Sequence, residues 1–171
     1  TNFKKPIVLR FGTLDLVHSK WRTYDQPLGA ASGGTLEASA VSLEENAEKT
    51  PVNYVLPPGI SREQDPSQPQ LVEANEQALS LVVKDLTHGE AKAVYKNSTL
   101  DLRQYKRIQM FTHANALEQN TTNLKNDQLA VFIRLGSDYK NNYYEYEIPL
   151  KLTEPRNNYN RNSSADRKLV W

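Results

Sequence analysis

The sequence predicts an all-β protein: a β-sandwich of the jelly-roll or carbohydrate-module type, with a long proline-rich loop. Three features lead to this class. Short segments of alternating apolar and polar residues recur along the chain, five prolines crowd residues 50–70, and no long amphipathic helical pattern occurs. We count roughly eight short strands at the spacing typical of sandwiches and barrels. The jelly roll itself is assigned by analogy.

The clearest element is a hairpin within residues 128–152. In its second strand Glu145 and Glu147 share one parity, and a set of apolar residues shares the other. This period of two predicts an apolar face turned inward and a charged face turned outward. The first strand, 129–135, is apolar on both parities, so we expect it to be covered on both sides. The residues expected on the inward face of the second strand are Tyr144, Tyr146, Ile148, Leu150 and Leu152.

Weaker alternation predicts further strands nearer the N-terminus. We expect strands at 7–11, 14–17 and 21–24, and a less regular one at 36–40. The glycine-rich stretch Gly29–Gly34 reads as a flexible connector between them.

The segment 50–70 carries Pro51, Pro57, Pro58, Pro66 and Pro69, which exclude a helix or a central strand. A loop of this length is uncommon in a compact domain, so we expect it to wrap the surface or to carry a contact function. Its apolar side chains indicate that it packs onto the domain; they are Tyr54, Val55, Leu56 and Ile60.

The middle of the chain predicts a second hairpin, formed by strands at 79–83 and 91–95 around a turn at 87–90. One helical turn is expected at 101–105. Residues 108–114 are apolar on both parities and predict a central strand, and a polar loop follows.

Composition bounds the class of protein. The 171 residues suffice for one domain with its own core, which we place at 1–155, followed by a polar and mobile tail at 156–171. The absence of cysteine excludes thiolate chemistry and disulfides. A formal net charge of +1 offers no field to attract nucleic acid or an anionic membrane. The two ends of the chain suggest a segment of a longer polypeptide.

No residue pattern predicts an enzyme, a metal site or a cofactor. His18, His88 and His113 lie far apart without metal-ligand spacing. Glu145 and Glu147 would suit acid–base work only in a pocket, and cross-strand ion pairing is the simpler interpretation. The basic cluster Arg103, Lys106 and Arg107 is interpreted as a solvated face, with no nucleic-acid partner expected.

Aromatic residues are the best candidates for binding. Tyrosines crowd the 128–152 hairpin, and an outward tyrosine beside carboxylates can stack on a sugar ring or on a partner side chain. Ordinary edge packing is the competing interpretation, because tyrosine is a good strand former. The candidate binding residues are Tyr54, Tyr139, Tyr143 and Glu145.

Long segments of the chain resemble the SprA/Sov family, the outer-membrane translocon of the type 9 secretion system of Bacteroidetes. The resemblance is carried by GTLDLVHSKWRTY (12–24), by 43–63, 65–81 and 90–117, and by LAVFIRLGSDYKNNYYEYEIPLKLT (129–153). It does not extend over 25–42 or the tail after Pro155.

This resemblance implies a soluble domain inserted in a large secretion protein of the outer membrane, extracellular or periplasmic, in a system that also supports gliding motility. The implied role is structural, with contacts to other secretion-system subunits and to secreted cargo. The family offers no catalytic residue to carry over. A glycan-binding jelly-roll module is the alternative, and whether a calcium ion occupies the Asn- and Asp-rich turns stays open.

Overall fold

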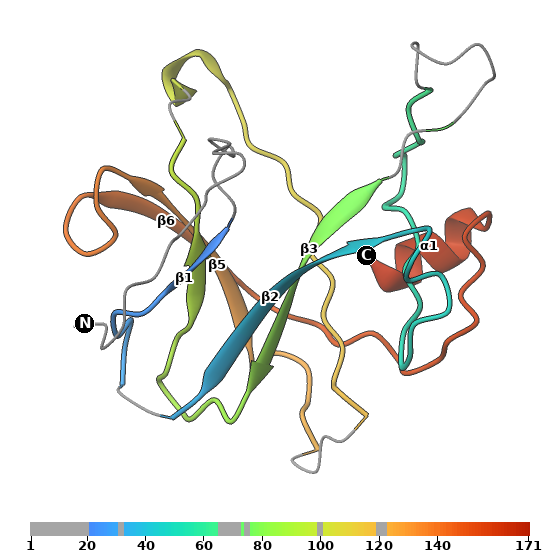
Figure 1. Ribbon diagram of the computed structural model, residues 1–171, viewed down its shortest axis with the longest axis horizontal. Helices are drawn as coiled ribbons and strands as arrows, with labels where there is room; N and C mark the ends of the chain where they lie inside the picture. The colour runs from blue at the N-terminus through green and yellow to red at the C-terminus, as the bar shows by residue number, and fades with distance from the viewer. Residues whose placement is uncertain (1–20, 31–32, 65–72, 74–75, 99–100, 119–122) are drawn as a thin grey trace, which may run out of the picture. The chain divides into compact units, whose positions relative to one another are not determined.

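A computed structural model describes residues 21–30, 33–64, 73, 76–98, 101–118 and 123–171 (Figure 1). Strands dominate its regular structure, which confirms the all-β class. The elements in chain order are β1 (Arg22–Tyr24), β2 (Thr35–Ser42), β3 (Gln77–Lys84), β4 (Ala93–Tyr95), the 3-10 turn η1 (Leu102–Gln104), β5 (Ala130–Gly136), β6 (Tyr143–Pro149) and α1 (Ser164–Val170). The strands expected at 7–11 and 14–17 lie outside the described residues.

The described strands form three two-stranded sheets, β1–β4, β2–β3 and β5–β6. The expected turn at 87–90 is present, since the Glu90 N–H donates to the Thr87 carbonyl at 3.0 Å. The predicted pairing of the strands that flank this turn is wrong, because β3 pairs with β2 and β4 pairs with β1. Residues on either side of a turn favour a hairpin only when no other strand competes for their edges. The stacking of sheets into a sandwich stays a prediction.

The chain divides into two compact units. One comprises residues 1–38 with 81–102, and the other comprises 39–80 with 103–171. Each unit joins segments that are distant in sequence, so contacts between these segments hold that unit together. The domain boundary expected at residue 155 stays a prediction.

In the first unit, β1 and β4 are antiparallel, with Tyr24 opposite Ala93. Tyr24 and Tyr95 meet edge to face, with ring centroids 6.1 Å apart. The Gly29–Gly34 connector is anchored at its start, where the Ala30 N–H donates to the Gly89 carbonyl at 2.9 Å. Gly29 has a φ of 140°, and a Cβ added there would lie 2.4 Å from the Gly89 oxygen, so this position requires glycine.

The core of the second unit is built on the proline-rich loop. Val55 is fully buried, and Tyr54 and Leu56 are each 9% exposed, which confirms that this loop packs down. Ile60 is the exception, since it is exposed. The buried residues form two clusters, and Trp171 packs against both. The first cluster contains Val52, Val55, Tyr159 and Val170; the second contains Leu43, Tyr54 and Leu56.

Buried hydrogen bonds fasten this loop to the C-terminal residues. The Asn53 side chain donates to the Tyr159 carbonyl at 2.9 Å and accepts from the Tyr159 N–H at 3.0 Å. The Trp171 indole N–H donates to the Val55 carbonyl at 2.8 Å. A loop without a strand ladder must satisfy its buried backbone groups in this way.

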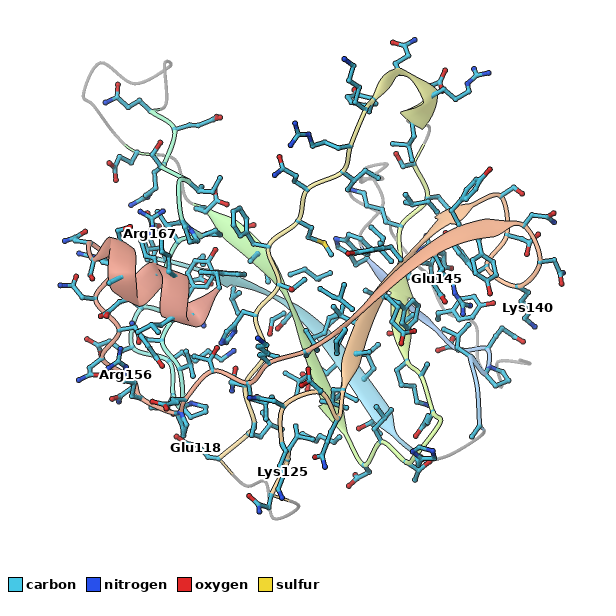
Figure 2. The ribbon with its side chains drawn as sticks, turned by 180° about the vertical axis from the view of Figure 1, so that it is seen from behind. Glu118, Lys125, Lys140, Glu145, Arg156 and Arg167 are labelled. Atoms are coloured by element: carbon cyan, nitrogen blue, oxygen red, sulfur yellow. The ribbon has the colours of Figure 1, made fainter. Side chains whose placement is uncertain are left out.

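The segment after Pro155, expected to be a polar tail, folds into helix α1 and contributes core residues. The Ser163 hydroxyl caps the helix by accepting from the Asp166 N–H at 3.2 Å. Arg167 lies on this helix (Figure 2). It donates to the carbonyls of Leu56, Pro57 and Ile60. The helix is short, so these tertiary contacts rather than helix propensity hold it in place.

The central strand predicted at 108–114 is wrong, because these residues form no strand. Residues 108–111 are exposed, and 112–114 are half-buried. One backbone hydrogen bond ties the segment down, from the Thr153 N–H to the Ala114 carbonyl at 2.8 Å. Apolar composition on both parities favours a central strand only where two neighbouring strands are available.

Candidate functional site

The candidate site is the β5–β6 hairpin, whose two strands were predicted from the alternation and are antiparallel. Arg134 lies opposite Glu145, Ile133 opposite Tyr146 and Leu135 opposite Tyr144. Because side chains alternate between the two faces of a strand, this register separates an apolar face from a polar one.

Arg134 organises the polar face. Its guanidinium carbon lies 4.3 Å from the centroid of the Tyr143 ring and 5.2 Å from that of Phe132. It also forms an ion pair with Glu145 and donates to the Tyr139 carbonyl at 2.8 Å. A planar cation between two rings gains cation–π attraction while keeping its hydrogen bonds. The Tyr143 ring therefore has Arg134 stacked against it.

The apolar face is the largest departure from the sequence prediction. Tyr144 is 86% exposed and Tyr146 is 69% exposed, so the expectation that both point inward is wrong. Neither β5 nor β6 contains a buried residue, and Ile148 is half-buried. The alternation does separate two faces of the hairpin, but burial requires a second layer, and this sheet has two strands and no described layer that buries the apolar face.

The hairpin loop is ordered by one carboxylate. Asp138 accepts hydrogen bonds from the backbone N–H groups of Lys140, Asn141 and Asn142, and from the Asn142 side chain. The hydrogen bond from Asn141 is the main cause that holds the pKa of Asp138 well below its usual range. The loop, with Lys140 at its tip, extends from the strand that bears Glu145 (Figure 2).

Three of the four candidate binding residues meet at one place. Tyr139, Tyr143 and Glu145 all contact Arg134, whereas Tyr54 belongs to the core and meets Trp171 edge to face at 6.3 Å. Burial is the main cause that raises the pKa of the Tyr54 hydroxyl, and the nearby Glu76 adds to it.

Sequence reasoning missed two features of the site. Arg134 could have been found, because aligning the two predicted strands around the 136–142 turn places it opposite Glu145. The exposure of Tyr144 and Tyr146 carried no local signal, since an apolar face looks the same whether it packs inside the domain or against another molecule.

His113, one of the three histidines weighed as a metal ligand, lies beside the core at 5.9 Å from the Trp171 ring. Burial, followed by repulsion from Lys49, lowers its pKa to about 4. Its Nε2 atom is buried without a hydrogen-bond partner. Within the described ranges, no three His, Asp or Glu side chains converge closely enough to hold a metal ion.

None of the helices in the part of the chain that the structure describes has the length and apolar character needed to cross a membrane. Comparison with curated proteins and with solved structures gives no match. The family model SprA_N, described as a motility-related/secretion protein, matches residues 1–171. The chain therefore belongs to the SprA_N family of motility-related and secretion proteins.

Proposed function

We propose that this chain is a non-enzymatic contact domain of the type 9 secretion translocon, and that the apolar face of the β5–β6 hairpin is its contact surface. The observation that carries the proposal is the exposure of Tyr144 and Tyr146 on a regular strand. Membership of a motility and secretion family supports the cellular setting.

The exposed tyrosines suit a protein partner. Large aromatic side chains contribute much of the binding energy at interfaces, where they become desolvated in the partner's pockets. Across the hairpin they lie next to Leu135 and Ile133, so the face offers aromatic rings over an aliphatic base. Exposed apolar patches of this kind mark interaction sites more often than scattered single residues do.

The opposite face supplies rigidity. The ion pair of Arg134 with Glu145 and its stacking on Tyr143 hold the two strands together without help from a second sheet. A surface that is ordered before binding loses less conformational entropy when the partner docks. The hairpin is thus prepared to present its tyrosines to another subunit or to emerging cargo.

We place the parent protein in the outer membrane, with this domain outside the bilayer and in contact with secretion-system subunits. The proline-rich loop is a poor candidate for that contact, because Val55 and its neighbours form the core. Deleting residues 50–70 would remove this core, so a test at the hairpin is more direct.

The test replaces both exposed tyrosines, Tyr144→Ser and Tyr146→Ser, in the parent protein and measures co-purification of secretion-system subunits together with secretion of cargo. The proposal expects loss of at least one partner and reduced secretion at an unchanged level of the parent protein. The control is Glu147→Gln, which lies on the polar face of the same exposed strand. Unchanged partners and unchanged secretion in the double variant would contradict the proposal.

A further inference from the structure

A second surface stands apart from the hairpin and from the proposed function. It is the segment 103–111, sequence RQYKRIQMF, which we call the basic arm. It begins in the η1 turn, and all nine of its residues are exposed. Most exposed segments are polar, whereas this one combines cations with large apolar side chains.

The apolar content of the basic arm is high for a solvated loop. Tyr105 is 64% exposed, Ile108 54% and Met110 58%. Phe111 is 46% exposed, and its ring also meets Trp171 edge to face at 6.3 Å. Single exposed apolar residues are ordinary, but here four lie within seven positions, interleaved with Lys106, Arg107 and Gln109.

The same segment carries a local excess of positive charge. Arg103, Lys106 and Arg107 give the basic arm a charge of +3 without any acidic residue. Because the whole chain carries +1, its remaining residues together carry −2. The net charge of +1 gave no reason to expect an anionic membrane as partner, but it conceals this local cluster of cations.

Two of these cations are available to a ligand. The structure gives Lys106 and Arg107 no hydrogen bond or ion pair with another described side chain, and both are exposed. A ligand that pairs with both cations would supply negative charge, and one that also covers the apolar side chains would offer an apolar environment close to that charge.

We propose that the basic arm binds the surface of an anionic lipid bilayer. Anionic headgroups attract the cations, and the boundary between headgroups and acyl chains accepts the neighbouring apolar side chains. Met110 and Phe111 are consecutive, so a protein groove would need a matched pocket for each. A fluid bilayer accepts both without such a match. An acidic protein surface is the competing partner, and the test separates the two.

The test is sedimentation of the purified chain with vesicles of phosphatidylcholine alone or with about 30 mol% phosphatidylglycerol. The proposal expects binding to the anionic vesicles alone, weakened by added salt. Lys106→Gln with Arg107→Gln should lower the partition coefficient about 25-fold, since each cation near an anionic surface contributes about fivefold. Ile108→Ser with Met110→Ser should lower it at high salt, where the apolar contribution remains.

The matched control is Lys125→Gln with Lys151→Gln, which removes two exposed cations elsewhere in the same unit. It should leave the partition coefficient within about twofold of that of the unaltered chain. Far-ultraviolet spectra check that every variant keeps its fold. Absence of binding to anionic vesicles, or an equal loss in the control, would overturn the proposal. Binding to an acidic polypeptide such as polyglutamate but not to the vesicles would assign the arm to a protein partner instead.

Discussion

The proline-rich core and the β5–β6 hairpin are built in opposite ways. The core is formed by a loop and the C-terminal helix, and it buries Val55 completely although no strand ladder runs through it. The hairpin has the most regular backbone of the second unit, with seven paired positions, yet it buries no residue. Regular secondary structure and burial are therefore separate properties in this molecule.

The difference has a physical cause. A loop can form a core when side chains and caps satisfy its backbone groups, as Asn53 and Trp171 do here. The hairpin pairs its facing backbone groups across the two strands, and it is held further by the Arg134–Glu145 ion pair and by the hydrogen bonds to Asp138 in its loop. The exposed apolar face of the hairpin, which carries Tyr144 and Tyr146, is then available for contact with another molecule.

The sharpest test of this contrast compares two aromatic residues. Trp171→Ala should lower the free energy of unfolding by about 3–5 kcal/mol, because it opens a cavity beside both core clusters and removes the hydrogen bond to Val55. Tyr144→Ala should change it by less than about 0.5 kcal/mol, since that side chain is already in solvent. Chemical denaturation measures both values, and equal effects would erase the distinction between the two regions.

The second prediction concerns pH. His113 has an ordinary pKa of 6.5 and a folded-state pKa of about 4, so the unfolded chain binds the proton more readily between these values. Stability should therefore fall as the pH drops from about 7 to 4, by about 3 kcal/mol at pH 4. The control His113→Phe should abolish this share of the slope, and an identical slope in that variant would show that His113 is not the cause.

The hairpin should respond to acid in a lower range. Asp138 has a depressed pKa, so its contribution is present above the ordinary aspartate pKa of about 3.9 and is lost as the pH falls below that value. Between pH 7 and 5, acid should therefore act on the core and leave the hairpin loop ordered. Amide chemical shifts of residues 138–142 follow the loop directly.

The effect expected at Arg134 is smaller than those at Trp171 and His113. Arg134→Gln removes an ion pair and a ring contact, but both partners of the pair are partly exposed, so the loss should stay below about 1 kcal/mol. Arg134→Lys keeps the charge and loses the planar stacking, so its stability should lie between that of the unaltered chain and that of Arg134→Gln. A loss of several kcal/mol would mean that the hairpin contributes to the core after all.

The sequence predicted the local features of the molecule well. The strands β5 and β6, their turn, β3 and the inward packing of Tyr54 to Leu56 follow from alternation, turn residues and apolar content. Helix α1 was missed although its signal was present, because Ser163 followed by Asp166 is a typical N-cap pattern. The strand expected at 108–114 was wrong because strand formation depends on partners that no local pattern specifies.

The grouping of the candidate site residues on one hairpin could be predicted from the sequence, but the exposure of its tyrosines could not. Tyr139, Tyr143 and Glu145 do gather, because the hairpin register brings them to Arg134. Tyr144 and Tyr146 were assigned to the interior, since the same alternation serves a buried face and a contact face. Only the presence or absence of a second layer distinguishes the two.

Hydrogen exchange, recorded on the free chain and on the parent protein in its secretion assembly, tests the central claim most directly. In the free chain the amides of residues 52–56 and 167–171 should exchange slowest, and those of β6 should exchange faster. In the assembly, β6 should gain protection while the core stays unchanged. Slowest exchange at β6 in the free chain, or no gain on assembly, would contradict the hairpin as the contact surface.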